Sequence, residues 1–465
     1  MKQPRININW YIICDVISAA LTWLFFYFLR TVIYHFDFSI PPGFYLGGIL
    51  YISGWLSLHF LSGAYESIYH KSAINEFLRT TVVCLIGCLG LLFFFILKNP
   101  HGDNMNYYQE FYSLLFPVFF CTLLLRLLFL RRARNQLKNN KVYFNILLIG
   151  SGKNASQFFD SFISTNANTG YHITSFLSIN AHTNTQLPET IKKYDGLDTI
   201  NSIIDKDAIE EVIITVEKNE RDTLTTILRQ LSDKDVNIKI TADAVDIISG
   251  AVQTSNVTGM PLIDVHNGLL PSWQKNIKRF MDISIAAISL FLLLPLLLYT
   301  ALRTRLSSNG TVFFRQQRLG FKGKPFNIIK FRSMVQNAEQ NGPMLSSSHD
   351  PRITLWGKTM RKWRLDELPQ LWNIIKGDMS LVGPRPERKF YCDQIVEQRP
   401  EYKYLLKVKP GLTSWGMVKF GYASSVSEMI QRMPYDIMYI ENISVLLDIR
   451  ILLQTIRIIL SGNGK

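Results

Sequence analysis

The apolar stretch Ile283–Leu302, ISIAAISLFLLLPLLLYTAL, decides how the chain is arranged around a membrane. It has about the ~20 residues that a helix needs to span a bilayer, but Pro295 interrupts it, and proline inside a helix removes a hydrogen bond and kinks it. Cations flank the stretch on both sides: Lys275, Lys278, Arg279, Arg303 and Arg305. Both flanks therefore favour the cytoplasmic face. We predict a re-entrant helix over about 281–303 that breaks at Pro295, with an ordinary fifth span as the alternative.

Four further apolar runs precede residue 131, each near the length of a membrane-spanning helix. They are roughly Trp10–Ile33, Phe44–Leu61, Thr80–Leu97 and Tyr112–Leu130. Lys and Arg gather before the first run and after the fourth, whereas the loop Tyr34–Gly43 has none. The positive-inside rule then places the N-terminus and everything after residue 131 in the cytoplasm. The sequence predicts a four-helix transmembrane domain over 1–134.

The overall composition fits membrane segments followed by a soluble part. Of the 465 residues, 48% are hydrophobic and 18% are charged, which excludes a disordered chain. The net charge of +14 suits phosphorylated substrates or anionic lipid. Because the basic residues flank an apolar membrane run, we expect no nucleic-acid partner. The five cysteines form no Cys-x-x-Cys motif, so neither a zinc site nor a disulfide framework is expected.

Alternating apolar strands and helices over 142–265 predict a Rossmann-like cytosolic domain with a parallel sheet. After its first strand, Gly150–Ala155 fits G-x-G-x-x-A, a turn that can hold a pyrophosphate. A dinucleotide site expects an acidic residue at the end of the second strand, where Asn180 stands. The turn is thus either a ligand site, as in a nucleotide-dependent oxidoreductase, or simply a tight turn of small residues. A regulatory or assembly domain fits better, and we assign no cofactor-binding residue.

The residues that can carry chemistry lie in the C-terminal third, 275–465. The stretch Arg361–Gln370, RKWRLDELPQ, places the adjacent carboxylates of Asp366 and Glu367 among three cations. Pro369 suits the first turn of a helix, so the pair is expected at a helix start, where the helix dipole and arginines attract phosphate. One carboxylate can attack phosphorus, and its neighbour can hold Mg²⁺. An isolated pair of this kind is usually only a surface ion pair.

A second phosphate-friendly stretch is SLVGPRPE, Ser380–Glu387. Two prolines hold Arg385 in a stiff loop, from which a guanidinium can grip phosphate through two hydrogen bonds. Together with the carboxylate pair, this loop predicts chemistry on a diphosphate, whose charge must be neutralised by cations or Mg²⁺.

Six stretches, in order along the chain, carry a family resemblance: Lys278–Asp282, Phe314–Gly320, Lys330–Met334, Leu365–Gln370, Ser380–Glu387 and Lys409–Thr413. They closely resemble the bacterial polyprenyl-phosphate sugar-1-phosphate transferases, the monotopic phosphoglycosyl transferases. The four spans and the Rossmann-like middle domain look like the large form of this family, found in capsule and exopolysaccharide assembly. The expected fold is thus a four-span α-helical membrane segment, an α/β cytosolic domain and a mainly helical catalytic domain with a re-entrant helix.

The resemblance implies a two-step reaction. Asp366 would attack the β-phosphate of a UDP-sugar, usually UDP-glucose or UDP-galactose in this form, and UMP would leave. Undecaprenyl phosphate would then take the sugar phosphate from the enzyme, which initiates capsule, exopolysaccharide or O-antigen assembly. Glu367 would hold Mg²⁺, Arg361 would support the pair, and Pro295 matches the family's helix break. The expected substrate-binding residues are Lys330, Arg332, Arg385 and Glu387.

The resemblance also sets partners and location. We expect a multi-pass protein of the bacterial inner membrane that contacts membrane lipids, with its catalytic domain on the cytoplasmic face. A homodimer is compatible with the sequence. The tail Tyr435–Leu460 could lie along the membrane as an amphipathic helix or pack on the catalytic core. The rival hypothesis is a non-catalytic scaffold or regulator with a phosphate-binding module, for which Asp366→Asn would leave pathway flux intact.

Overall fold

The computed structural model describes residues 5–35, 37, 40, 42–98, 104–166, 170–179, 188, 191–215, 221–231, 234, 236–241, 262–265, 270–336, 338, 342, 344–345 and 350–461. The chain forms two compact units, Met1–Asn267 and Gly268–Lys465. The first unit contains the membrane helices together with the α/β fold. The second contains the carboxylate pair.

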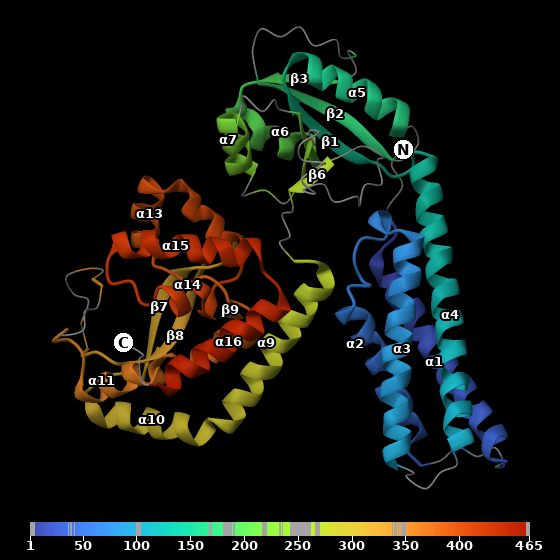
Figure 1. The fold of residues 1–465 in the computed structure, drawn as a ribbon, viewed down its shortest axis with the longest axis horizontal. Helices are drawn as coiled ribbons and strands as arrows, with labels where there is room; N and C mark the ends of the chain where they lie inside the picture. The colour runs from blue at the N-terminus through green and yellow to red at the C-terminus, as the bar shows by residue number, and fades with distance from the viewer. Residues whose placement is uncertain are drawn as a thin grey trace. The chain divides into compact units, whose positions relative to one another are not determined.

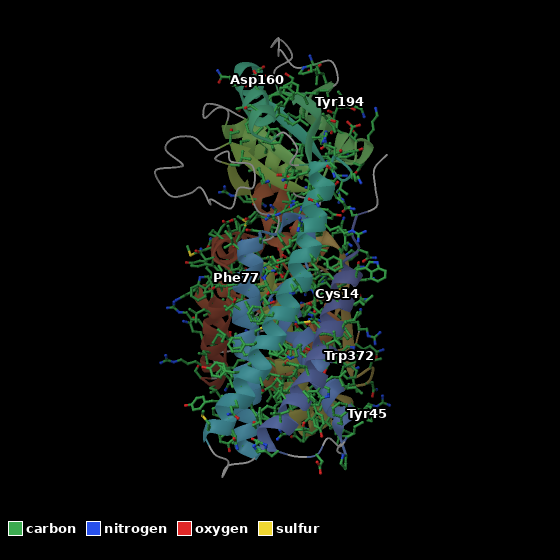
Figure 2. All side chains as sticks on the ribbon, turned by 90° about the vertical axis from the view of Figure 1, so that its right-hand side faces the viewer. Cys14, Tyr45, Phe77, Asp160, Tyr194 and Trp372 are labelled. Carbon is green, nitrogen blue, oxygen red and sulfur yellow. The ribbon has the colours of Figure 1, made fainter. Side chains whose placement is uncertain are left out.

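The first unit begins with four apolar helices (Figure 1): α1 Ile8–Tyr34, α2 Phe44–Leu61, α3 Ala73–Lys98 and α4 Asn104–Lys138. All four are long and apolar enough to cross a membrane, as the sequence predicted. Their interior packs Phe26, Trp55, Cys84 and Val118, one from each helix. Apolar side chains such as Phe77 also project outward (Figure 2). A bundle that is apolar both inside and outside is suited to a lipid surrounding.

One polar cluster interrupts the interior of this bundle. Arg126 of α4 pairs with Asp15 of α1 through Nη2 and Oδ2 at 2.7 Å, and with Glu76 of α3 through Nη1 and Oε1 at 3.0 Å. Tyr11 donates its hydroxyl to the same Glu76 oxygen at 2.8 Å. The ionic side chains are at most 2% exposed. The guanidinium therefore ties three helices together.

The α/β part has a six-stranded sheet in the order β3-β2-β1-β4-β5-β6. The strands are β1 Phe144–Gly150, β2 Tyr171–Ser178, β3 Lys192–Asp195, β4 Glu211–Thr215, β5 Asn237–Thr241 and β6 Leu262–Val265. The first five strands run parallel, and β6 is antiparallel to β5. The predicted parallel sheet is confirmed. The sequence predicted strands at the positions of β1, β2, β4 and β5, but none at β3 or β6.

Helices cover both faces of this sheet. They are α5 Gly152–Asn166, α6 Ile200–Lys206 with the short η2 Leu197–Thr199 before it, and α7 Arg221–Leu231. Phe158, Phe159 and Phe162 of α5 pack on one face, while residues of α6 and α7, such as Ile203 and Ile227, pack on the other. This is the layered arrangement that alternating strands and helices predict.

The glycine turn after β1 has a packing explanation. A Cβ at Gly150 would lie 2.0 Å from Thr215 Oγ1 of the neighbouring strand, so only glycine fits there. This contact supports the interpretation as a tight turn of small residues. Asn180, on which the argument about a dinucleotide site rested, lies outside the described residues.

Side chains near the start of the chain connect the bundle to the sheet. Arg5 forms an ion pair with Glu210 at 2.6 Å between Nη2 and Oε1, and its guanidinium lies 4.6 Å from the ring centre of Phe144. His70, in the short η1 Ile68–His70 between α2 and α3, also packs on Phe144. These contacts explain why the bundle and the α/β part form one compact unit.

The second unit is mainly helical. Its helices are α9 Ser272–Leu292, α10 Leu294–Ser307, α11 Leu355–Lys362, α12 Gln370–Lys376, α13 Lys389–Gln398, α14 Trp415–Lys419, α15 Val426–Glu441 and α16 Val445–Leu460. Its short 3-10 turns are η4 Phe321–Gly323, η5 Leu365–Glu367 and η6 Pro400–Lys407. The strands β7 Phe313–Leu319 and β8 Pro325–Phe331 pair antiparallel, and β9 Ser380–Val382 pairs parallel with β10 Gly411–Thr413.

The apolar stretch around Pro295 forms two helices bent by 65°, α9 and α10 (Figure 1). Pro295 is the second residue of α10, where its missing N–H costs no intrahelical bond. Large apolar side chains near the bend are exposed, with Phe291 at 78% and Leu292 at 68%. The predicted break is therefore present, and it lies at Leu293, two residues before Pro295.

The predicted tail helix, Tyr435–Leu460, is two helices, since the chain leaves the helical path at Asn442–Ser444 between α15 and α16. The helix α15 buries Met429, Met433 and Ile440 in the core. In contrast, α16 exposes an apolar stripe at three- and four-residue spacing: Leu446, Ile449, Leu453, Ile456 and Leu460. One helix thus packs on the core, and the other presents an apolar face.

Candidate active site

The carboxylate pair lies in the 3-10 turn η5, between α11 and α12. Arg364 precedes this turn in the left-handed conformation, with φ of 57°, which is uncommon for a residue other than glycine. Pro369 caps the start of α12, as predicted from the sequence. The turn holds both Asp366 and Glu367 in the interior, at 8% and 7% exposure. The pair is therefore no surface ion pair.

Glu367 is surrounded by donors from distant parts of the unit. Its Oε1 accepts hydrogen bonds from Lys330 Nζ at 2.9 Å, Arg385 Nη2 at 3.2 Å and the Tyr422 hydroxyl at 3.2 Å. Its Oε2 faces Arg364 Nη1 at 3.6 Å. Burial alone would raise the pKa of Glu367, but the cations, Lys330 first and then Arg385, hold it well below its usual range. Glu367 is thus an ionised anchor for three cations.

Asp366 has a different environment. Burial, and then the adjacent charge of Glu367, raises its pKa above the ordinary value, although Lys330 and Arg361 oppose this shift. Its Oδ1 is buried and has no hydrogen-bond partner in the described part of the chain. A carboxylate oxygen without a donor is less stabilised, and a substrate that contacts it would displace no hydrogen bond. Of the two carboxylates, only Asp366 has a buried oxygen that lacks a partner among the described residues.

The other predicted site residues divide into two groups. Lys330 and Arg385 contact Glu367 directly, and the charge of Arg361 acts on Asp366 while its Nε donates to Ser333 Oγ at 3.0 Å. Arg332 instead donates to the hydroxyl of Ser308 at 3.0 Å, next to the end of α10. The structure brings the first three together with the carboxylates and places Arg332 at another contact.

Glu387 also has partners of its own. It forms ion pairs with Arg318 at 3.2 Å and with Arg432 at 2.9 Å, and these cations keep its pKa below the ordinary value against the effect of burial. Its backbone carbonyl accepts from Leu319 N at 3.1 Å. Glu387 therefore fastens the Arg385 loop to β7 and α15. Its predicted role as a substrate-binding residue remains a prediction.

Tyr422 is the residue that sequence reasoning missed. The guanidinium of Arg364 lies 4.0 Å from the centre of its ring and that of Arg385 lies 4.5 Å away, while its hydroxyl contacts both Arg364 and Glu367. Its ring therefore holds the two arginines by cation–π contact. Tyr422 lies 55 positions after Glu367, so only the fold reveals the contact.

Among the described residues, no group of three or more His, Cys, Asp or Glu side chains could hold a metal ion alone, so a Mg²⁺ ion at this site would have to share ligands with a substrate. This ion prefers hard oxygen ligands and is commonly held by one or two carboxylates together with substrate phosphates. Two oxygens meet this requirement here, the unpartnered Asp366 Oδ1 and Glu367 Oε2, which has only a long contact with Arg364. Glu367 Oε1, by contrast, is taken by three donors.

The fold and this site define a class of protein: a membrane-associated chain with a buried carboxylate pair among cations that can bind phosphate groups. Comparison with known proteins makes the class specific. Residues 273–462 match the bacterial sugar transferase family, and residues 61–242 match a family described as a CoA-binding domain.

Curated relatives agree with the first of these matches. The chain is 46% identical, over 188 residues, to a UDP-N-acetylgalactosamine-undecaprenyl-phosphate N-acetylgalactosaminephosphotransferase of Aeromonas hydrophila, covering 40% of this chain and 44% of the relative. It is 32% identical over 250 residues to a UDP-glucose:undecaprenyl-phosphate glucose-1-phosphate transferase of Escherichia coli, covering 53% and 54%. The chain thus spans about half the length of these two relatives.

A third relative is matched over more of its length. This is a UDP-glucose:undecaprenyl-phosphate glucose-1-phosphate transferase of Caulobacter vibrioides, 40% identical over 191 residues that cover 40% of this chain and 71% of the relative. The chain belongs to the bacterial sugar transferase family. The resemblance seen in the sequence motifs is therefore confirmed.

Proposed function

We propose that this protein transfers a sugar-1-phosphate from a UDP-sugar to undecaprenyl phosphate and releases UMP. The observation that carries the proposal is the buried carboxylate pair, in which one carboxylate is fixed by cations and the other has an unpartnered oxygen. The three relatives described above are named as undecaprenyl-phosphate sugar phosphotransferases, which supports the same reaction class. The product would initiate capsule, exopolysaccharide or O-antigen assembly.

In the first step, a carboxylate oxygen of Asp366 attacks the sugar-bearing phosphorus of the donor. A new O–P bond forms, the bond from this phosphorus to the bridging oxygen breaks, and UMP leaves with the bonding electron pair. Lys330, Arg385 and Arg364, which surround the neighbouring Glu367, would neutralise charge on the diphosphate, as phosphoryl transfer requires. Arg361 would help keep Asp366 ionised.

In the second step, a phosphate oxygen of undecaprenyl phosphate attacks the same phosphorus, and the Asp366 carboxylate leaves unchanged. The product is a lipid diphosphate sugar. We propose that Mg²⁺, held by Glu367 and by substrate phosphates, supplies further charge neutralisation at the diphosphate. Because Glu367 Oε2 is the less engaged oxygen, it is the proposed ligand.

The membrane placement is part of the proposal. The bent pair α9–α10 would enter and leave the cytoplasmic leaflet of the bacterial inner membrane, since cations flank both of its ends. The exposed apolar stripe of α16 would lie at the same surface. This arrangement would bring the carboxylate pair to the boundary where a cytosolic sugar nucleotide meets the phosphate of a membrane lipid.

The test is UMP release by the purified full chain with Mg²⁺, undecaprenyl phosphate and one UDP-sugar at a time. The panel contains UDP-glucose, UDP-galactose and their N-acetylated counterparts, because the relatives' names include both glucose and N-acetylgalactosamine. We expect UMP release with only one of these donors. Without undecaprenyl phosphate, each chain should release no more than one UMP. Folded protein that releases no UMP with any donor would favour the scaffold hypothesis.

Tyr422 gives a prediction for the same assay. Tyr422→Phe keeps the ring and removes the hydroxyl, whereas Tyr422→Leu also removes the surface on which Arg364 and Arg385 lie. We expect kcat to fall about tenfold in the first variant and about 100-fold in the second, since a desolvated cation–π contact is worth about 2 kcal/mol. Tyr435→Phe, at a 38% exposed position, is the control. Equal activities of the Phe and Leu variants would refute the role assigned to the ring.

A further inference from the structure

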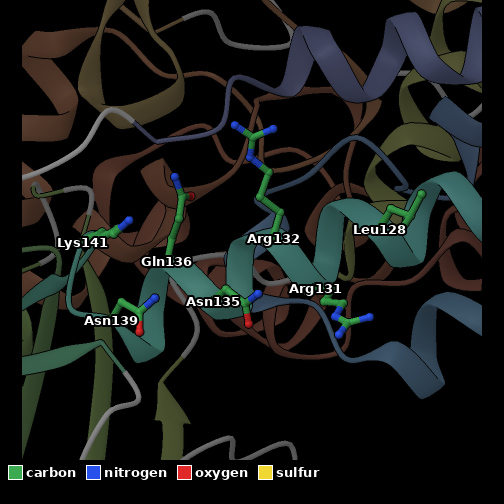
Figure 3. A pocket seen from close by; sticks show the side chains of 7 residues that line it. All are labelled: Leu128, Arg131, Arg132, Asn135, Gln136, Asn139 and Lys141. Atoms are coloured by element: carbon green, nitrogen blue, oxygen red, sulfur yellow. The ribbon is translucent and has the colours of Figure 1, made fainter.

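A cavity of about 510 Å³ lies beside the C-terminal end of α4 (Figure 3). All of its seven lining residues belong to the first unit, on α4 and on the turn that follows it. Leu128, Arg131, Arg132 and Asn135 are separated by three and four positions, so they lie on one face of the helix. None of the lining residues belongs to the unit that contains the carboxylate pair.

In the other direction, a row of exposed apolar side chains continues from Leu128 and winds slowly around the helix. Tyr112, Phe116, Phe120 and Leu124 precede Leu128 at intervals of four residues, and each is between 50% and 61% exposed. The rings of Tyr112, Phe116 and Phe120 stack in sequence, with centres 5.7 and 6.3 Å apart. This exposed surface of α4, which winds around the helix, thus changes from apolar to cationic at Leu128.

The lining chemistry is that of an anion site. Three of the seven lining residues are cations, Arg131, Arg132 and Lys141, and three are amides, while none of the seven is acidic. The amide oxygen of Gln136 accepts from the Tyr69 hydroxyl at 2.6 Å, so its NH₂ group remains as a donor. Several donors around one cavity suit the oxygens of a phosphate group.

We propose that this surface of α4 binds a lipid with a phosphate headgroup. The headgroup would occupy the cavity beside Arg131 and Arg132, and the hydrocarbon chain would lie along the apolar row from Leu128 to Tyr112. Basic pockets at the cytoplasmic ends of membrane helices hold anionic lipid headgroups by this combination of contacts. The shared chemistry, a phosphate on a long hydrocarbon chain, is found both in anionic phospholipids and in polyprenyl phosphates.

The positive-inside rule alone does not explain this surface. That rule accounts for any cation beyond the end of the span, including Arg134 and Lys138 on the same helix. Those two residues do not line the cavity, although they lie within the same two turns as Arg131 and Arg132. They therefore provide a control with equal charge on the same end of the helix, although Lys138 lies six residues beyond Arg132.

The test compares two double variants of the full chain, Arg131→Gln with Arg132→Gln, and Arg134→Gln with Lys138→Gln. Each protein is purified in detergent, shown to be folded by its melting curve, and titrated with phosphatidylglycerol, undecaprenyl phosphate or phosphatidylcholine, with bound lipids per chain counted by native mass spectrometry. We expect the cavity variant to lose one bound phosphate lipid and to weaken its binding at least tenfold. The control should stay within twofold of the wild type.

The arms of this experiment distinguish the lipid sources. A larger loss for phosphatidylglycerol assigns the site to a phospholipid, and a larger loss for undecaprenyl phosphate assigns it to the polyprenyl lipid. Equal weakening of both double variants would show a general charge effect and overturn the proposal, as would unchanged binding in the cavity variant or an equal loss of phosphatidylcholine. Because the readout is binding, the result does not depend on whether the chain transfers sugar phosphate.

Discussion

Replacing Asp366 by asparagine should abolish UMP release, with a loss of about 10³-fold or more. An amide has no carboxylate oxygen to attack phosphorus, so the covalent route is closed. Asparagine has nearly the same shape as aspartate, and the cations around Glu367 stay in place, because they contact Glu367 itself. The steady-state rate with the preferred UDP-sugar, measured for both proteins, checks this prediction.

A second measurement separates lost chemistry from lost binding. In the absence of undecaprenyl phosphate, the wild-type chain should gain the mass of one sugar phosphate, located at Asp366 by peptide mass spectrometry, and the variant should gain none. Asp393→Asn is the control, because this carboxylate is 59% exposed and its ion pair is with the surface residue Lys389. A variant that retains activity would rule out Asp366 as the nucleophile.

The pH profile carries a further signature of Asp366. Burial and the charge of Glu367 raise its pKa above 3.8, and only the ionised form attacks. The rate of sugar-phosphate attachment should therefore be full at neutral pH and fall as the pH drops through this raised value. The rate should therefore begin to fall at a higher pH than it would with an ordinary aspartate as the nucleophile. Single-turnover rates between pH 4 and 8 measure it.

Local sequence signals predicted part of this molecule well. The length of the apolar runs predicted four membrane helices, and Pro295 predicted the break between α9 and α10, because both effects act within a few residues. Pro369 placed the carboxylate pair before a helix for the same reason. The strand β3, Lys192–Asp195, was missed because its four residues are polar and show no apolar alternation.

The contacts of the site could not be read in the same way. Tyr422 reaches Glu367 from 55 positions away, and Arg432 reaches Glu387 from 45. No local pattern marks either contact, since each depends on how α15 and the loop before it pack on the rest of the unit. The motifs placed Arg332 and Glu387 in the substrate site, a role that stays a prediction. Their contacts with Ser308 and with two other arginines depend on the fold and could not be read from the motifs.

Replacing Arg126 by leucine should severely destabilise the membrane bundle. Asp15 loses its ion-pair partner at 2.7 Å, and Glu76 loses its partner at 3.0 Å. Both carboxylates are buried. Removing one partner of a buried ion pair typically costs about 3–5 kcal/mol, because the other charge remains unpaired. We expect a much lower yield of folded protein and a clearly lower melting temperature in detergent. Arg134→Leu, on the exposed side of the same helix, should melt close to the wild type.

A double variant tests whether pairing is the cause. Arg126→Leu combined with Asp15→Leu removes both charges of the shorter pair, while Glu76 keeps Arg79 at 3.4 Å and Lys71 at 3.7 Å. The double variant should therefore be more stable than Arg126→Leu alone, a non-additive result that only a direct interaction gives. If the second substitution instead lowers stability further, Arg126 acts through packing. Helices in lipid gain little from apolar contact with one another, so the three charged side chains that join α1, α3 and α4 are a directional contact that can fix their register.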